Sequence, residues 1–137
     1  MWSYRHVVIW TRFAVPLAVA LALGAIGCSG ASTTSPTPGG PAPSTATITI
    51  TSSGVSPATV TISAGGQVTF VNHDSRNHNM QSDPHPEHTD CPELAQVGFL
   101  VPGQSRTSGN FNTVRTCGYH DHDDFANTRL WGKIVIQ

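Results

Sequence analysis

Three segments of this 137-residue chain alternate apolar and polar side chains with a period of two. They lie at 47–51, 59–62 and 67–71, and the last follows the turn-forming pair Gly65-Gly66. Such alternation buries one face of a β-strand, whereas an amphipathic helix needs apolar residues three or four positions apart. This pattern predicts an all-β domain.

Further strands are expected at 78–82, 105–111, 113–117 and 131–137, with a turn at Pro102-Gly103 and a short helix starting at Asp90, capped by Asp90 itself. Seven short strands within residues 46–137 favour an antiparallel β-sandwich. The 7 Lys and Arg against 8 Asp and Glu leave a formal charge of -1. Without a basic surface, binding to nucleic acid or to an anionic membrane face is not expected.

Residues 1–27 have the pattern of an export signal, with Arg5, His6 and Arg12 preceding an uncharged apolar run at 13–27. That run is shorter than the roughly 20 residues that cross a bilayer, so a transmembrane helix is the weaker alternative. The sequence from Ala25 to Cys28 resembles the lipobox of bacterial lipoproteins, with Ala25 where the family usually has Leu. The resemblance implies that Cys28 is lipidated and that 1–27 is removed. Cleavage nearby without lipidation stays open.

Residues 28–45 follow as a Ser/Thr/Pro/Gly-rich segment with no charge and no large apolar side chain after Cys28. Nothing in it offsets the entropy lost on ordering the chain, so it is expected to be a disordered linker. The chain would then be an exported lipoprotein of the cell envelope, on the periplasmic face or at an outer membrane, with its folded domain at 46–137. Its only membrane contact would be the lipid.

Two segments of that domain hold the residues with metal-binding chemistry. His78 starts the strand expected at 78–82, and Cys117 and His120 are three residues apart after the strand expected at 113–117. Two imidazoles and one thiolate are a donor set that suits copper. Three fixed ligands also limit reorganisation between Cu(I) and Cu(II), which favours outer-sphere electron transfer.

At this point the sequence resembles the cupredoxins, the plastocyanin and azurin family. The stretches that carry the resemblance are 55–72, 72–79, and 117–120 followed by 132–136. It implies a Greek-key β-sandwich of about seven strands, with copper bound by His78, Cys117 and His120. Asn79 matches the family residue that ties the ligand loops together and supports the thiolate.

The axial ligand departs from the family pattern, because Leu130 stands where a Met is usual. A three-coordinate site, a fourth ligand from His122, and a fourth ligand from the inserted loop at 82–91 all remain open. Met80 is expected to pack in the interior.

Cys91 provides an alternative to the copper thiolate. Once Cys28 is lipidated, Cys91 and Cys117 are the two remaining cysteines of an exported domain, where such pairs are commonly oxidised. A Cys91-Cys117 disulfide would remove the thiolate. The Cys117-x-x-His120 spacing argues for the copper ligand, so both interpretations stand.

The segment at 82–91 contributes two more imidazoles: His85, which lies between Pro84 and Pro86, and His88. It is either a solvated loop stiffened by proline or part of an all-nitrogen copper or zinc site with His78, His120 and His122. A His-x-His motif with a disulfide is also similar to copper-zinc superoxide dismutases, but the strand motifs favour cupredoxins. Enzymatic activity is not expected.

The function that follows is a lipid-tethered, copper-binding single-electron carrier outside the cytoplasm, acting as a monomer. Its redox partner would be a protein such as a cytochrome, steered by Asp121, Asp123 and Asp124. The alternative is a copper-binding or copper-handling module with the Cys91-Cys117 disulfide and a histidine-rich type 2 site. A third hypothesis is an interaction module that binds no metal.

Overall fold

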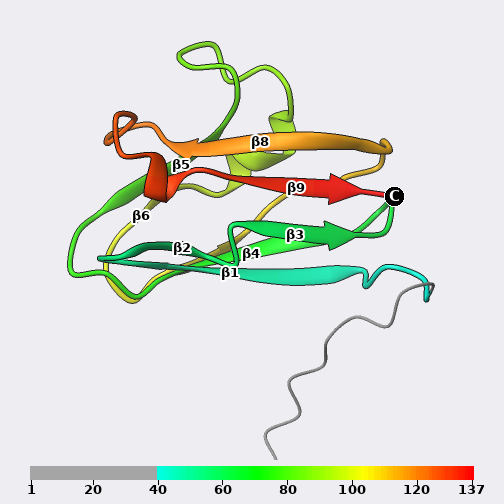
Figure 1. Ribbon diagram of the computed structural model, residues 1–137, viewed down its shortest axis with the longest axis horizontal. Helices are drawn as coiled ribbons and strands as arrows, with labels where there is room; N and C mark the ends of the chain where they lie inside the picture. The colour runs from blue at the N-terminus through cyan, green and yellow to red at the C-terminus, as the bar shows by residue number, and fades with distance from the viewer. Residues whose placement is uncertain (1–39) are drawn as a thin grey trace, which may run out of the picture. The chain divides into compact units, whose positions relative to one another are not determined.

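The structure is a computed structural model that describes residues 40–137. The signal sequence at 1–27, the lipidated Cys28 and most of the linker lie outside the described residues, so those hypotheses stay predictions. The described residues form two β-sheets packed face to face (Figure 1). No helix among them has the length and apolar character needed to cross a membrane.

Nine strands and two short 3-10 helices make up the domain. The first sheet has the order β2 (Gly54–Ser56), β1 (Thr45–Thr51), β4 (Gln67–Asn72) and β7 (Ser105–Thr107). The second has the order β3 (Thr59–Ile62), β9 (Gly132–Ile136), β8 (Arg115–Asp121), β5 (His78–Ser82) and β6 (Gly98–Leu100). The helices are η1 (Pro92–Gln96) and η2 (Thr128–Leu130).

Apolar side chains from both sheets fill the space between them, as the period-two alternation of the sequence predicts. Ile48 and Phe70 from the first sheet and Ile62 and Ile134 from the second are fully buried. The ring of Phe70 meets that of Tyr119 edge to face across the sandwich, at 5.2 Å between centroids. The prediction of an all-β sandwich is therefore confirmed.

The sheets are mixed, which corrects the expectation of purely antiparallel pairing. β1 pairs with β4 and β3 pairs with β9 in parallel. In both cases the chain between the paired strands passes through the opposite sheet. Such a crossover allows the second strand to run in the same direction as the first. β2 and β6 were not predicted, because three residues are too few to show a period. Helix η1 follows Cys91 and has no side-chain cap, so the predicted cap at Asp90 is wrong.

The difference that matters most for function is the length of β8. The sequence predicts that this strand ends at Cys117, but β8 continues to Asp121 with regular antiparallel pairing to β5. Met80 lies opposite Asp121, and Gln81 lies opposite His120. His120 is therefore a strand residue and not a loop residue.

Candidate metal centre

Cys117 and His120 lie on opposite faces of β8. Successive side chains of a strand alternate between its two faces, so residues three apart point in opposite directions. Cys117, Tyr119 and Asp121 share the inner face, where Cys117 and Tyr119 belong to the hydrophobic core. His120 lies on the outer face, so the Cys-x-x-His spacing does not bring the two side chains to one ion.

The sulfur of Cys117 is bonded to Cys91, with a Cα–Cα distance of 5.9 Å. Both cysteines are buried in the core. This disulfide is the one that the alternative interpretation requires. It corrects the prediction that Cys117 is a free thiolate, since a half-cystine does not bind copper as a thiolate.

His78 is also separated from the other two predicted ligands. The β5–β8 register, continued two residues past the end of β8, places His78 opposite Asp123, which is six residues or roughly 20 Å along the strand direction from Cys117. Its Nδ1 lies 2.7 Å from Asp121 Oδ2, and its Nε2 lies 3.2 Å from Asp74 Oδ2. The structure therefore does not bring His78, Cys117 and His120 together.

Asp74, His78 and Asp121 form a closed polar cluster on the inner face, called here the inner cluster. The second oxygen of Asp121 accepts the backbone N–H groups of Asn79 and Asp123. Burial alone would raise the pKa of Asp74, but hydrogen bonds from the Ser75 N–H, His78 and Arg76 hold it below its ordinary value. Both ring nitrogens of His78 already lie against carboxylate oxygens, so neither nitrogen points toward an open metal position.

Four imidazoles gather on the opposite face of the same strands. His85, His88, His120 and His122 each place a ring nitrogen within 4.8 Å of the others; they are called here the outer cluster. His120 is on β8, and His122 extends the ladder because its N–H donates to the Asn79 carbonyl. His85 and His88 come from the β5–η1 loop, which lies beyond β8 on the side away from the β1 sheet (Figure 1).

The nitrogens of the outer cluster are poorly satisfied. His120 is fully buried, with its Nδ1 2.7 Å from Asp83 Oδ1. Its Nε2 and the Nδ1 of His85 are buried and have no hydrogen-bond partner among residues 40–137. His122 Nδ1 and His88 Nε2 lie 3.1 Å apart. Buried polar atoms without partners are rare and costly, so these nitrogens fit a site that takes a ligand.

His88 is held in a sparsely populated conformation. It is the one described non-glycine residue with positive φ, at 54°, and its N–H donates to the Pro84 carbonyl at 2.7 Å. Desolvation first, and then repulsion from His122, His120 and His85, lower the pKa of His88. A lowered pKa keeps this imidazole neutral, which is the form that binds metals.

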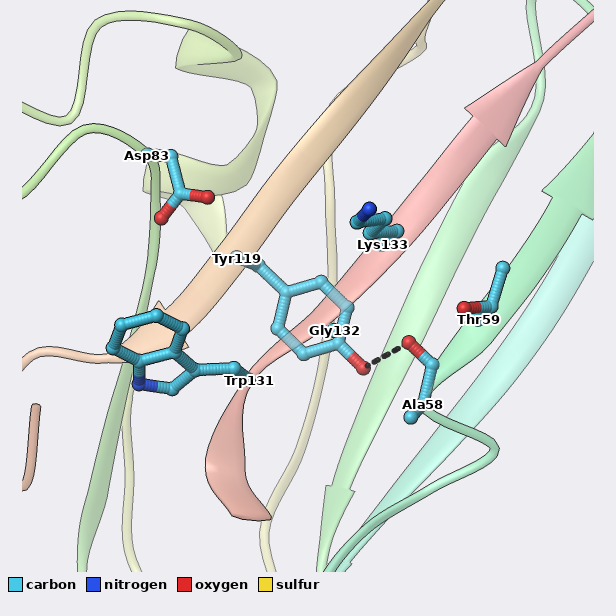
Figure 2. Close-up of a pocket in the computed structure, with 7 residues that line it drawn as sticks. All are labelled: Ala58, Thr59, Asp83, Tyr119, Trp131, Gly132 and Lys133. Atoms are coloured by element: carbon cyan, nitrogen blue, oxygen red, sulfur yellow. Dashed lines mark hydrogen bonds between the residues drawn. The ribbon is translucent and has the colours of Figure 1, made fainter. Parts of the chain in front are cut away.

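Aromatic side chains close one side of the outer cluster. The ring of Phe125 stacks on His85 at 4.1 Å and meets His120 edge to face at 5.0 Å. Trp131 lies against Phe125 and 6.4 Å from the ring of His120. A neighbouring surface pocket of about 310 Å³ runs between Asp83, Trp131, Tyr119 and Lys133 (Figure 2). Solvent thus reaches Asp83 while the ring of His120 stays covered.

The remaining predicted site residues have other roles. Asn79 donates to Asp123 and accepts from Gln81, so it ties β5 to the segment after β8 without touching a cysteine. Met80 is fully buried in the core, as predicted, and Leu130 is buried as well. The prediction that Asp121 helps to steer a redox partner is wrong, because this side chain is buried against His78. Sequence reasoning missed Asp74, Asp83 and Asp121 as partners of histidines. Asp83 and Asp121 adjoin the His-rich segments, but their partners depend on the β5–β8 register, which no local motif reveals.

No protein-family model matches this chain, and no curated protein matches its sequence. Solved structures do resemble it. A purple cupredoxin from Nitrosopumilus maritimus is 23% identical, with 67% of this chain and 99% of that chain covered and a TM-score of 0.51. The fold is that of the cupredoxins. An auracyanin from Roseiflexus castenholzii is 15% identical, with 70% and 98% covered and a TM-score of 0.53. A mutant of amicyanin is 16% identical, with 68% and 82% covered and a TM-score of 0.52.

Proposed function

We propose that this cupredoxin-fold domain binds one copper ion through His85, His88, His120 and His122, and that it holds or hands on copper outside the cytoplasm. The observation that carries the proposal is the outer cluster itself. Four imidazoles converge within 4.8 Å, and two of their nitrogens are buried without a partner. One ion that accepts four lone pairs would satisfy these groups together.

Copper is favoured over other ions by the donors. Four imidazole nitrogens suit Cu(II), and among divalent first-row metals copper forms the most stable complexes with such a site. Amicyanin, a neighbour in fold, is described in a Cu(I) form. Zinc is the competing ion, since it also accepts imidazole ligands. Copper would supply a single-electron couple when bound.

Residues of this chain would hold the ion in distinct ways. His120 contributes Nε2 from a rigid strand, since Asp83 occupies its Nδ1. His85 and His88 contribute from the β5–η1 loop, which the Cys91–Cys117 disulfide ties to β8. Phe125 stacks on His85 and shields the cluster from water on one side.

Single-electron transfer with a partner protein is the second candidate, and the aromatic contacts favour it. Phe125 and the partly exposed Trp131 connect the ring of His120 to the surface. Without a thiolate, however, the ligands differ from the donor set that the sequence suggested. Imidazoles from a loop also restrain Cu(I) and Cu(II) less tightly than a rigid trigonal site, so copper holding remains the first proposal.

Location outside the cytoplasm is part of the same proposal. Disulfides persist in oxidising compartments, and the described residues contain one between buried cysteines. The export signal at 1–27, the lipidated Cys28 and the linker would place the domain at the cell envelope, tethered by lipid.

Titration of the metal-free domain with Cu(II), followed by calorimetry and electron paramagnetic resonance, tests the proposal. One equivalent should bind, with hyperfine structure from imidazole nitrogens and without the intense visible band of a copper thiolate. His122→Ala should weaken binding strongly. The matched control is His73→Ala, which removes an exposed imidazole outside the cluster. Absence of stoichiometric binding would reject the proposal and leave the interaction module without metal.

A further inference from the structure

We propose that Asp83 is a positioning residue that fixes the orientation and tautomer of His120 and thereby sets the copper affinity of the outer cluster. The inference rests on the proposed function and extends it to a residue that is not itself a ligand. It is carried by the contacts of Asp83 with His120 and Gly118.

The contact with His120 determines which ring nitrogen carries the proton. Asp83 Oδ1 lies 2.7 Å from His120 Nδ1, and an ionised carboxylate only accepts hydrogen bonds. His120 therefore donates through Nδ1–H, which leaves the lone pair on Nε2. That Nε2 is one of the two nitrogens of the outer cluster that are buried without a partner in the part of the chain that the structure describes. Asp83 thus presents the buried ring to the cluster in its metal-binding tautomer.

The backbone around Asp83 is well fixed. Its N–H donates to the Gly118 carbonyl at 3.1 Å, which extends the β5–β8 ladder by one residue. Its own carbonyl accepts the N–H of Asp90 at 2.9 Å and so closes the loop that carries His85 and His88. The carboxylate therefore starts from a defined position over β8.

Gly118 provides the space for that carboxylate. A Cβ at this position would overlap the Oδ2 and Cγ atoms of Asp83. Gly118 has no positive φ, so the backbone conformation does not demand glycine here. Glycine weakens the interior of a strand and often marks a close approach by another group. In β8 that approaching group is the Asp83 side chain.

Positioning explains this contact better than a purely structural ion pair. The side chain of Asp83 remains 42% exposed, so burial does not oblige it to find a partner. Carboxylates bonded to the second nitrogen of a metal-binding histidine hold the ring in place and increase its basicity. Loss of such a partner typically weakens metal binding about 10-fold to 100-fold.

The test compares Asp83→Ala, Asp83→Asn and Gly118→Ala with the wild-type domain. The first readout is the His120 tautomer, measured in the metal-free protein by nitrogen NMR at a pH where the ring is neutral. Wild type should be protonated at Nδ1, and Asp83→Ala should shift His120 toward the Nε2–H form. Asp83→Asn keeps an acceptor and should retain the Nδ1–H form.

The second readout is the Kd for Cu(II). Asp83→Ala and Gly118→Ala should both raise it about 10-fold to 100-fold, with Asp83→Asn between them and wild type. Asp90→Asn is the matched control, because it removes an exposed carboxylate from the same loop without touching a ring, and its Kd should equal that of wild type. Circular dichroism identifies any variant that does not fold.

An unchanged tautomer and an unchanged Kd in folded Asp83→Ala would overturn the inference. Equal loss of affinity in Asp90→Asn would do the same, since the effect would then be one of loop charge. Because the tautomer is read without metal, this result is separate from the proposed function. A wild-type domain that shows the Nδ1–H form but binds no copper would reject the copper site and keep the Asp83–His120 contact.

Discussion

The inner and outer clusters lie on opposite faces of β5 and β8, and they differ in how their imidazoles are satisfied. In the inner cluster, His78 has a carboxylate on each ring nitrogen, and those carboxylates accept further N–H groups. In the outer cluster, four imidazoles mainly face one another, and only His120 has a carboxylate partner among the described contacts. The first arrangement is complete without a ligand, and the second is not.

This contrast teaches that a histidine at the position expected for a ligand need not be one. His78 matches the motif that suggested a copper site, yet its hydrogen bonds serve the packing of loops at the strand ends. The loop residues His85 and His88 match no family motif, yet they complete the group that offers free nitrogens. Removal of inner residues should therefore cost stability, and removal of outer residues should cost metal binding.

The largest effect on stability is expected for His78→Ala. This change leaves the buried carboxylates of Asp74 and Asp121 without the ring that contacts both of them, which should lower the free energy of unfolding by about 1–3 kcal/mol for each carboxylate. Copper stoichiometry of the folded protein should not change. His122→Ala is the contrasting variant, with a loss of copper binding and little change in urea denaturation. The opposite pattern would invalidate the distinction between the clusters.

Removal of the disulfide should affect both properties. With a sequence separation of 26, the chain-entropy relation gives a loss of roughly 3–4 kcal/mol for Cys91→Ala/Cys117→Ala. Copper affinity should fall as well, because the loop with His85 and His88 is no longer tied to β8. Denaturation and calorimetry on the same sample check both effects. Unchanged affinity would show that the loop is held without the disulfide.

A smaller effect of opposite sign is expected at His88. His88→Gly relieves the positive φ and should stabilise the metal-free domain by about 1 kcal/mol, although it removes a ligand. His85→Gly also removes a ligand, but it relieves no positive φ, increases the freedom of the unfolded chain and removes the stacking on Phe125, so that variant should be less stable than the wild type. Thermal denaturation of the two metal-free variants distinguishes them, and equal shifts would contradict a strained His88.

The smallest predicted effect is a pH dependence at Asp74. Because its pKa in the folded protein lies below the ordinary value of 3.8, the unfolded chain binds more protons in this range. The stability contributed by Asp74 is thus present above that value and is lost as the pH falls through it toward the folded pKa. Asp74→Asn should flatten the fall in unfolding free energy between about pH 5 and pH 3. An equally steep fall in Asp74→Asn would show that other carboxylates cause this loss of stability at low pH.

Much of the fold was predictable, because alternation is a local signal. The strands at 59–62 and 78–82 have the predicted bounds. The strand expected at 113–117 does not, because it was predicted to end at Cys117, whereas pairing with β5 and β9 continues β8 to Asp121. Because β8 continues for four more residues, His120 is a strand residue on the outer face. It therefore joins the outer cluster and not a site with Cys117.

The candidate site was predictable only as a set of alternatives. The disulfide and the imidazoles of His85, His88 and His122 were among the open hypotheses, and local spacing did not decide between them. The decision came from contacts distant in sequence, such as Asp83 with His120 and Cys91 with Cys117. Such contacts follow from sheet register and not from a motif.

X-ray absorption at the copper edge of the Cu(II)-loaded domain tests the central claim most directly. The account predicts scattering from imidazole nitrogens only, with no sulfur shell, and loss of the imidazole signal in His85→Ala/His122→Ala. A sulfur ligand at the metal would contradict it, since copper would then be bound by Cys117 and the outer cluster would not be the site.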